Sequence, residues 1–121
     1  MAIKIGVLGC GSIAQNRHVA GYAKNSDVKI VAFYNKTKKT AQDLADKYGG
    51  VAFDNYQDFL NCDLDAVSVC LPNNLHASAC IDLLRLGKHV LCEKPMATTK
   101  KQCLQMIKAS KKSGKIGRAS C

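Results

Sequence analysis

The sequence predicts an α/β domain of the doubly wound kind, in which helices cover both faces of a parallel β-sheet. Three observations support this prediction. Short runs of branched apolar residues alternate with segments of helical periodicity, the connections between them are short, and a glycine-rich turn follows the first run. Because parallel strands need long crossover connections, usually helices, this alternation favours a parallel sheet.

Each strand is expected where a short apolar run meets turn residues, and each helix where apolar residues recur at helical spacing. Ser12 is available as the N-cap of the first helix. The predicted strands are residues 3–8, 28–34, 51–53, 66–71 and 88–92. The predicted helices are residues 12–24, 38–48, a short turn at 56–60, 75–86 and a last helix that begins near Thr98 or Thr99.

Length and composition indicate one globular domain. The chain has 121 residues, of which 47% are apolar and 22% charged, and we expect residues 1–121 to form a single domain. No charged leader with an apolar segment precedes the first strand, which predicts a cytoplasmic location. No apolar run approaches the roughly 18 residues that a spanning helix needs, so no membrane insertion is expected.

The net charge raises the question of a nucleic-acid partner. Eighteen Lys and Arg against nine Asp and Glu give +9 at pH 7. The positive residues cluster at 36–39 and at 100–118, but no aromatic residues interleave with the second cluster and no helix-turn-helix or zinc motif accompanies it. A solvated helix face is therefore the favoured interpretation, with no nucleic-acid partner.

Seven cysteines are present without any C-x-x-C pair, which predicts neither a metal site nor a disulfide framework. Most lie in apolar runs, where a reduced thiol packs as a small hydrophobe. Cys10, Cys70 and Cys92 fall at the expected carboxyl ends of neighbouring strands. Cys10 precedes a helix N-terminus, and we expect a lowered pKa for it.

A glycine motif directly after the first strand carries the strongest chemical signal. Residues Gly9 to Ala14 match G-x-G-x-x-A and open the first predicted helix. In this context the first glycine makes a tight turn, Gly11 lets the backbone approach a pyrophosphate, and Ala14 permits close helix packing. Helix N-terminal N–H groups at Ser12 and Ile13 then face the phosphates. The motif predicts a Rossmann-type domain that binds NAD or NADP.

The end of the second strand decides between the two dinucleotides. This motif usually continues with an acidic residue there, which binds the ribose hydroxyls, but the position holds Asn35. An amide binds a hydroxyl without repelling a 2′-phosphate, and Lys36, Lys38 and Lys39 follow to attract one. We therefore expect a preference for NADP, while NAD remains possible because exposed lysines contribute little.

Three segments together resemble a known family. They are residues 9–14, the run D-A-V-S-V-C-L-P-N-N-L-H-A at 65–77, and G-K-H-V-L-C-E-K-P at 87–95. This combination is similar to the N-terminal domain of the glucose–fructose oxidoreductase, inositol dehydrogenase and rhizopine-catabolism (Gfo/Idh/MocA) family. The resemblance implies an oxidoreductase that passes hydride between a nicotinamide cofactor and a sugar, cyclitol or related polyol.

The resemblance also implies roles for particular residues. In the Glu-Lys-Pro motif at 93–95, Lys94 would lie near the reacting hydroxyl or carbonyl as the catalytic residue, and Glu93 near the nicotinamide ribose. The residues implied to border the cofactor are Leu71, Pro72, Asn73 and His76. These segments follow the carboxyl ends of predicted strands, where ligands bind in doubly wound sheets.

The chain departs from the family after residue 115. Members continue into a sixth apolar strand and a substrate domain, whereas this sequence reads I-G-R-A-S-C and stops. We expect a truncated chain that binds cofactor without turnover, and a homo-oligomer formed through the sheet edge left bare by the missing strand. The alternative function is a nucleotide-sensing or nucleic-acid-binding module on the same fold.

Overall fold

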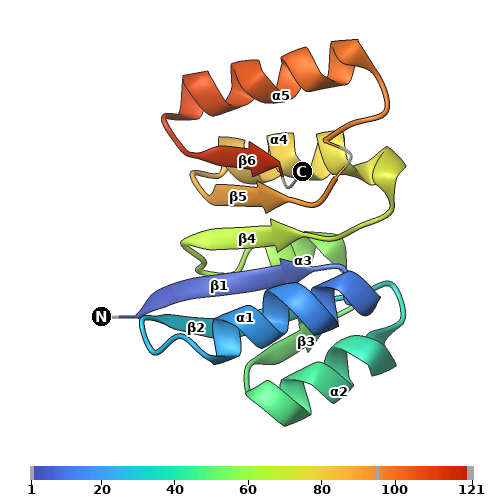
Figure 1. Cartoon of the computed structure of the whole chain (residues 1–121), viewed down its shortest axis with the longest axis vertical. Helices are drawn as coiled ribbons and strands as arrows, with labels where there is room; N and C mark the ends of the chain where they lie inside the picture. Colours follow the sequence, from blue (N-terminus) through green and yellow to red (C-terminus); the bar gives the residue numbers. More distant parts are fainter. Residues whose placement is uncertain (1, 95, 120–121) are drawn as a thin grey trace.

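The part of the chain that the structure describes folds around one six-stranded sheet in which every pair of neighbours is parallel. The computed structural model describes residues 2–94 and 96–119. The strand order is β3-β2-β1-β4-β5-β6 (Figure 1). The strands are β1 (Ile3–Leu8), β2 (Val28–Tyr34), β3 (Val51–Phe53), β4 (Ala66–Val69), β5 (His89–Cys92) and β6 (Gly117–Ala119). From β1 the chain first adds β2 and β3 on one side and then β4, β5 and β6 on the other, so the direction of strand addition reverses between β1 and β4. The predicted doubly wound architecture is therefore confirmed.

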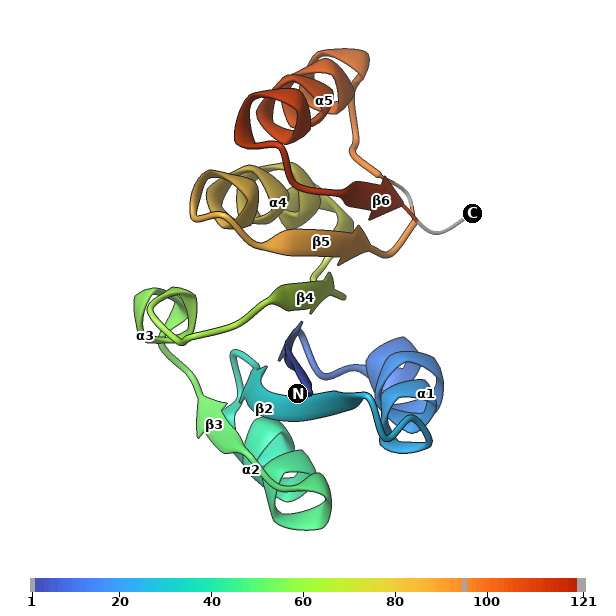
Figure 2. The same cartoon turned by 90° about the vertical axis from the view of Figure 1, so that its left-hand side faces the viewer.

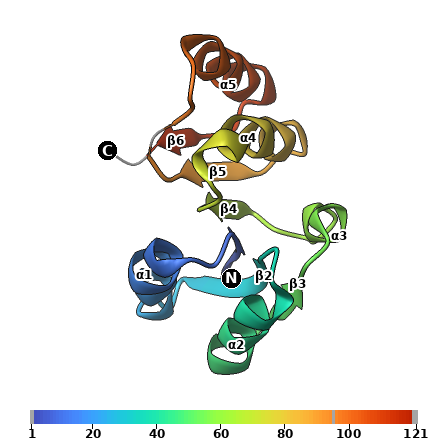
Figure 3. The same ribbon diagram turned by 90° about the vertical axis from the view of Figure 1, so that its right-hand side faces the viewer.

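Helices cover both faces of this sheet. The helical segments are η1 (Ala14–Val19), α1 (Ala20–Ala23), α2 (Lys38–Tyr48), α3 (Tyr56–Leu60), η2 (Asn73–Leu75), α4 (His76–Arg85) and α5 (Lys100–Ser113). Figures 2 and 3 show α1 on one side of the sheet and α3 and α4 on the other. Among the described residues, no helix combines the length and apolarity needed to cross a bilayer.

Two separate apolar cores follow from this layering. The core under α1 and α2 centres on Val7 and Phe33, which are fully buried. The core under α3, α4 and α5 centres on Phe59, Leu83 and Val69, also fully buried. Consecutive side chains of a strand point to opposite faces, so the buried run at the end of β1 supplies both cores.

The first helix does not begin as the sequence predicts. Residues 12–23 are helical without a break, so Ser12 lies inside the first turn and is not the N-cap. Its hydroxyl instead accepts a hydrogen bond from the Asn16 side chain at 3.2 Å. Ala14–Val19 is wound as a π-helix, which is rare and frequently found at functional sites.

The expectation of a missing sixth strand is wrong. Gly117 pairs with Val90 and Arg118 with Leu91, and the Val90 N–H donates to the Ile116 carbonyl at 2.8 Å. A parallel strand is held by its main-chain groups, so three residues suffice without an apolar run. Because β6 covers β5, the argument for self-association through a bare β5 edge no longer holds.

Candidate functional site

The predicted motif segments meet at one edge of the sheet. β1, β4 and β5 are neighbours and run in the same direction, so their carboxyl ends lie together (Figure 1). Gly9 follows β1, Leu71 follows β4 and Glu93 follows β5. This edge lies where the strand order reverses, which is where open α/β sheets bind their ligands.

The glycine turn has the backbone that the motif requires. Gly9 has φ +98°, and a Cβ there would lie 2.6 Å from the Cys70 carbonyl oxygen, so only glycine fits between β1 and β4. A Cβ on Gly11 would meet nothing within 4 Å, which leaves the turn open on the side where a pyrophosphate would approach. Ala14 is fully buried against the sheet, whereas Ser12 and Ile13 are exposed. The turn therefore fits a dinucleotide.

Asn35 connects the glycine turn to the start of α2. Its Oδ1 accepts from the Cys10 N–H at 3.2 Å, and its Nδ2 donates to the Thr37 carbonyl at 3.1 Å. Lys36, Lys38 and Lys39 are exposed beside it. Asn35 therefore connects the glycine turn to the segment before α2 through its two hydrogen bonds.

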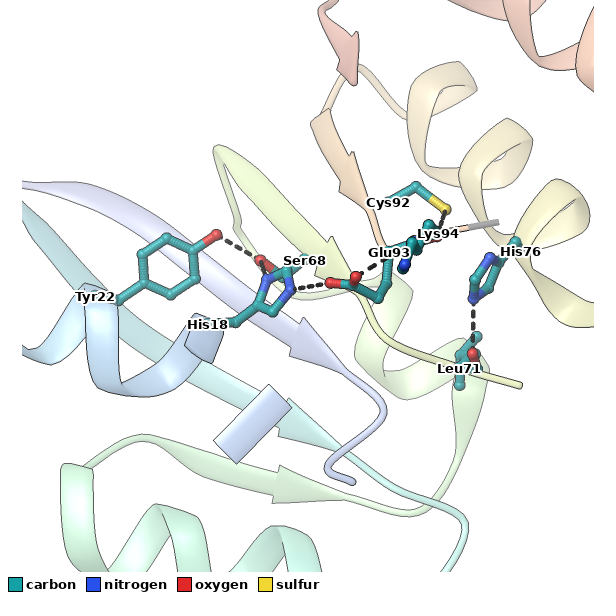
Figure 4. Close-up of polar contacts among 8 residues, drawn as sticks. All are labelled: His18, Tyr22, Ser68, Leu71, His76, Cys92, Glu93 and Lys94. Carbon is teal, nitrogen blue, oxygen red and sulfur yellow. Dashed lines mark hydrogen bonds and ion pairs between the residues drawn. The ribbon is translucent and has the colours of Figure 1, made fainter. Parts of the chain in front are cut away.

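A buried histidine hydrogen-bonds the backbone of the segment that follows β4. Leu71 is half-buried, and Pro72 and Asn73 are exposed. His76 is only 1% exposed, and its Nε2 donates to the Leu71 carbonyl at 2.7 Å. In this structure His76 holds the loop in place (Figure 4).

Glu93 is anchored by a residue that the sequence analysis did not identify. Glu93 Oε2 lies 2.7 Å from Nε2 of His18, and both side chains are largely buried, at 14% and 7% exposed. The hydrogen bond from His18 is the main reason that the pKa of Glu93 is lowered, with the Lys94 N–H and the charge of Arg17 adding to it and burial opposing it. Lys94 itself is exposed, and Pro95 lies outside the described residues.

Two further side chains, Ser68 and Tyr22, continue the chain of hydrogen bonds on the other side of His18. His18 Nδ1 lies 3.0 Å from the Ser68 hydroxyl, which in turn hydrogen-bonds the Tyr22 hydroxyl (Figure 4). Ser68 is fully buried in β4. A lone hydroxyl inside an otherwise apolar strand was the one signal in the sequence that could have pointed to a buried polar network, because a buried hydroxyl needs partners.

The expectation for Cys10 is wrong. Its thiol is 1% exposed and donates to the Tyr34 carbonyl at 3.2 Å. Burial raises the pKa of Cys10 to about 12, and burial is also the main cause that raises the pKa of Cys70 to about 12. Desolvation of the thiolate outweighs the helix N-terminus here. Every cysteine in the described part of the chain is free, and Cys121 lies outside that part.

No metal centre is found among the residues that the structure describes, since no three His, Cys, Asp or Glu side chains there are grouped to hold an ion.

The parallel sheet, its switch point and the open glycine turn define a dinucleotide-binding domain of the Rossmann type. The model of the Gfo/Idh/MocA oxidoreductases with an NAD-binding Rossmann fold matches residues 3–119, and the chain belongs to this family. The family resemblance, the fold and the nicotinamide dinucleotide predicted from the sequence are thereby confirmed.

Individual relatives agree with this assignment. A D-glucoside 3-dehydrogenase of Escherichia coli (strain K12) is 34% identical over 116 residues, which are 94% of this chain and 33% of that protein. An inositol 2-dehydrogenase of Salmonella typhimurium is 34% identical over 119 residues, 95% of this chain and 35% of that protein. The crystal structure of a 3-ketoreductase from Actinomadura kijaniata with NADP and TDP-benzene superimposes with a TM-score of 0.93 at 30% identity, over 99% of this chain and 37% of that one. The chain thus spans about a third of the length of these relatives.

Proposed function

We propose that this chain is the cofactor domain of an oxidoreductase that transfers hydride between NAD(P) and a hydroxyl carbon of a sugar, cyclitol or related polyol. One observation carries the proposal: the glycine turn, the loop after β4 and the Glu93-Lys94 pair lie at one edge of the sheet. By their names, the relatives described above are dehydrogenases of a D-glucoside and of inositol and a 3-ketoreductase.

The proposed contacts follow the order of the strands along this edge. The pyrophosphate lies at the glycine turn, the adenosine ribose beside Asn35 and Lys36, and the nicotinamide ribose beside Glu93. The pyrophosphate residues are Gly9, Gly11, Ser12, Ile13 and Ala14, and the loop that borders the cofactor is Leu71, Pro72 and Asn73, supported by His76.

When bound, the nicotinamide ring supplies the acceptor or donor of hydride. Lys94 is exposed next to the anchored Glu93. In the proposal its ammonium group donates a hydrogen bond to the substrate oxygen and, when a carbonyl is reduced, gives that oxygen its proton. The carboxylate of Glu93 has a fixed position next to Lys94, because His18 holds one of its oxygens.

The proposal includes a preference for NADP over NAD. Asn35 carries no charge that would repel a 2′-phosphate, and the exposed Lys36 and Lys38 lie within a few residues of it. The Asn35 Nδ2 group already donates to Thr37, so its second N–H is the one that would reach the ribose.

Three further expectations belong to the same proposal. The described cysteines are free thiols, as is usual in a reducing compartment, which supports a cytoplasmic location. The chain binds no nucleic acid, which a duplex titration at physiological salt tests.

The chain self-associates through an exposed apolar surface, and sedimentation at high concentration tests this. Exposed apolar side chains that could contribute to it near the end of the chain are Leu104, Ile107 and Ile116.

The pair Gly11→Ala and Gly21→Ala tests cofactor binding at the glycine turn. Neither new Cβ meets a protein atom within 4 Å, so both variants should fold with a melting temperature close to that of the unaltered chain. Only Gly11 lies where the pyrophosphate would approach. We expect calorimetry to show NADPH binding weakened at least about tenfold by Gly11→Ala and unchanged by Gly21→Ala. Equal affinities in both variants would contradict the proposed site.

A further inference from the structure

The hydrogen bonds around His18 join three elements near the carboxyl ends of β4 and β5. His18 lies in η1, Ser68 in β4, and Glu93 directly after β5. The imidazole contacts Glu93 through Nε2 at 2.7 Å and Ser68 through Nδ1 at 3.0 Å, so both ring nitrogens are engaged (Figure 4). Side chains bonded at both ends and withdrawn from water have little freedom to reorient.

The contacts determine which ring nitrogen carries a proton. A carboxylate only accepts, so Nε2 must donate to Glu93. In the neutral ring Nδ1 then accepts, and Ser68 donates its hydroxyl hydrogen to it. The Tyr22 hydroxyl in turn donates to the Ser68 oxygen. All donors point one way, from Tyr22 through Ser68 and His18 to Glu93, and every group is satisfied.

The local helix geometry places His18 in this position. His18 falls within the π-helical stretch Ala14–Val19, and the same helix starts at the glycine turn. A π-helical turn changes the direction of the side chains that follow it relative to a regular α-helix. One helix therefore contributes at two places, because its first turn lies beside the proposed phosphate site and His18 lies beside Glu93.

We propose that His18 is a positioning residue for Glu93, and that Ser68 and Tyr22 hold the imidazole in the orientation that directs its Nε2 proton at the Glu93 carboxylate. This inference rests on the proposed function, in which Glu93 contacts the nicotinamide ribose. His18 holds Oε2, so Oε1, whose one contact with the described residues is a long 3.4 Å contact with the Lys94 N–H, is presented to the ribose hydroxyls.

Neighbouring charges do not replace this contact. Arg17, on the same helix, acts on Glu93 through its charge and more weakly than the hydrogen bond from His18. Cys70 and Cys92, at the ends of β4 and β5, are also titratable neighbours of Glu93. The pKa of Cys70 is raised to about 12, first by burial, so its thiol stays protonated at neutral pH.

Nuclear magnetic resonance of the ¹⁵N-labelled chain tests the tautomer without any cofactor. Long-range ¹H–¹⁵N correlation distinguishes a protonated ring nitrogen from an accepting one, and His18→Gln assigns the signals. At pH 8 we expect Nε2 protonated and Nδ1 accepting in the unaltered chain. In Ser68→Ala, which removes only the hydroxyl oxygen, Nε2 should stay protonated, whereas the Nδ1 signal should shift because Nδ1 loses its hydrogen-bond donor. A proton on Nδ1 in the unaltered chain, or an Nδ1 signal that Ser68→Ala leaves unchanged, would overturn the inference.

Binding measurements test the positioning role. His18→Leu removes the donor to Glu93, whereas His18→Gln keeps an N–H that can reach the carboxylate. We expect NADPH affinity to fall about tenfold in His18→Leu, the effect of losing one hydrogen bond to a charged group, and to stay within about threefold in His18→Gln. Adenosine 2′,5′-bisphosphate, which lacks the nicotinamide ribose, should bind both variants as it binds the unaltered chain.

Comparing NADPH with adenosine 2′,5′-bisphosphate distinguishes loss of the Glu93 contact from general damage to the fold. An equal loss of NADPH and bisphosphate in His18→Leu would indicate general damage to the fold and would overturn the positioning role, as would unchanged NADPH binding. If the unaltered chain bound neither ligand, the proposed function would fail, whereas the tautomer measurement would still decide whether Ser68 orders His18.

Discussion

Asn35 shows how one side chain can serve two purposes at a binding site. Its oxygen accepts from the Cys10 N–H in the glycine turn and its nitrogen donates to Thr37. The sequence placed this residue correctly at the end of β2, but a single position in a motif carries no information about which backbone groups its amide will bond. In the proposed site, discrimination between dinucleotides and the shape of the glycine turn therefore depend on the same side chain.

Asn35→Asp should shift dinucleotide preference towards NAD(H). A carboxylate can still accept from the Cys10 N–H, so the glycine turn keeps its bond, but its charge repels a 2′-phosphate. We expect NADPH affinity to fall at least about tenfold while NADH affinity falls less or rises. Calorimetry with both cofactors at low salt checks this, and a parallel loss of both would mean that Asn35 acts only through the loop.

Glu93→Gln should lower stability at neutral pH and matter less in acid. The pKa of Glu93 is lowered in the folded protein, first by the hydrogen bond from His18, so its ionised form is favoured by folding. That contribution is present above the unfolded pKa of about 4.3 and disappears as the pH falls through the lower folded value. Urea unfolding of both proteins at pH 7 and pH 3 checks this. A stability difference that does not shrink at pH 3 would contradict it.

At the scale of elements, the sequence predicts most of the fold because periodicity and turn residues agree. The strands Ile3–Leu8 and Val28–Tyr34 and the helix Lys38–Tyr48 have the bounds expected of them. β6 was missed because backbone pairing alone holds it. The partnership of His18 with Glu93 was missed because the two are 75 residues apart and the π-helical turn breaks the regular helical spacing.

The caps of two helices give a matched test of local stability. Thr99 caps α5, and its hydroxyl accepts from the Gln102 N–H at 3.1 Å, whereas Thr37 occupies the same position in α2 without a side-chain cap. We expect Thr99→Ala to lower the free energy of unfolding by about 1 kcal/mol and Thr37→Ala by less than about 0.5 kcal/mol. Chemical denaturation checks both. Equal effects would show that the cap contributes nothing specific.

At the scale of the whole molecule, the chain should bind cofactor without turning over substrate. It spans about a third of the relatives it matches, and the described residues form one sheet with its covering helices. Orienting a substrate against the nicotinamide accounts for roughly 7–11 kcal/mol of a barrier, and we expect that orientation to need groups outside these 121 residues. A panel of sugars and cyclitols with NAD and NADP, followed by absorbance of the reduced cofactor, should show no rate above background. Turnover abolished by Lys94→Ala would contradict this.

The central claim is that one edge of the sheet holds the whole dinucleotide, from the glycine turn to Glu93. Backbone chemical-shift mapping during a titration with NADPH tests it most directly. We predict perturbations at residues 9–14, 35–36, 71–73 and 93–94, with His18 responding through its contact with Glu93. Changes confined to the lysine-rich helix α5, or changes at the glycine turn that never reach Glu93, would contradict it.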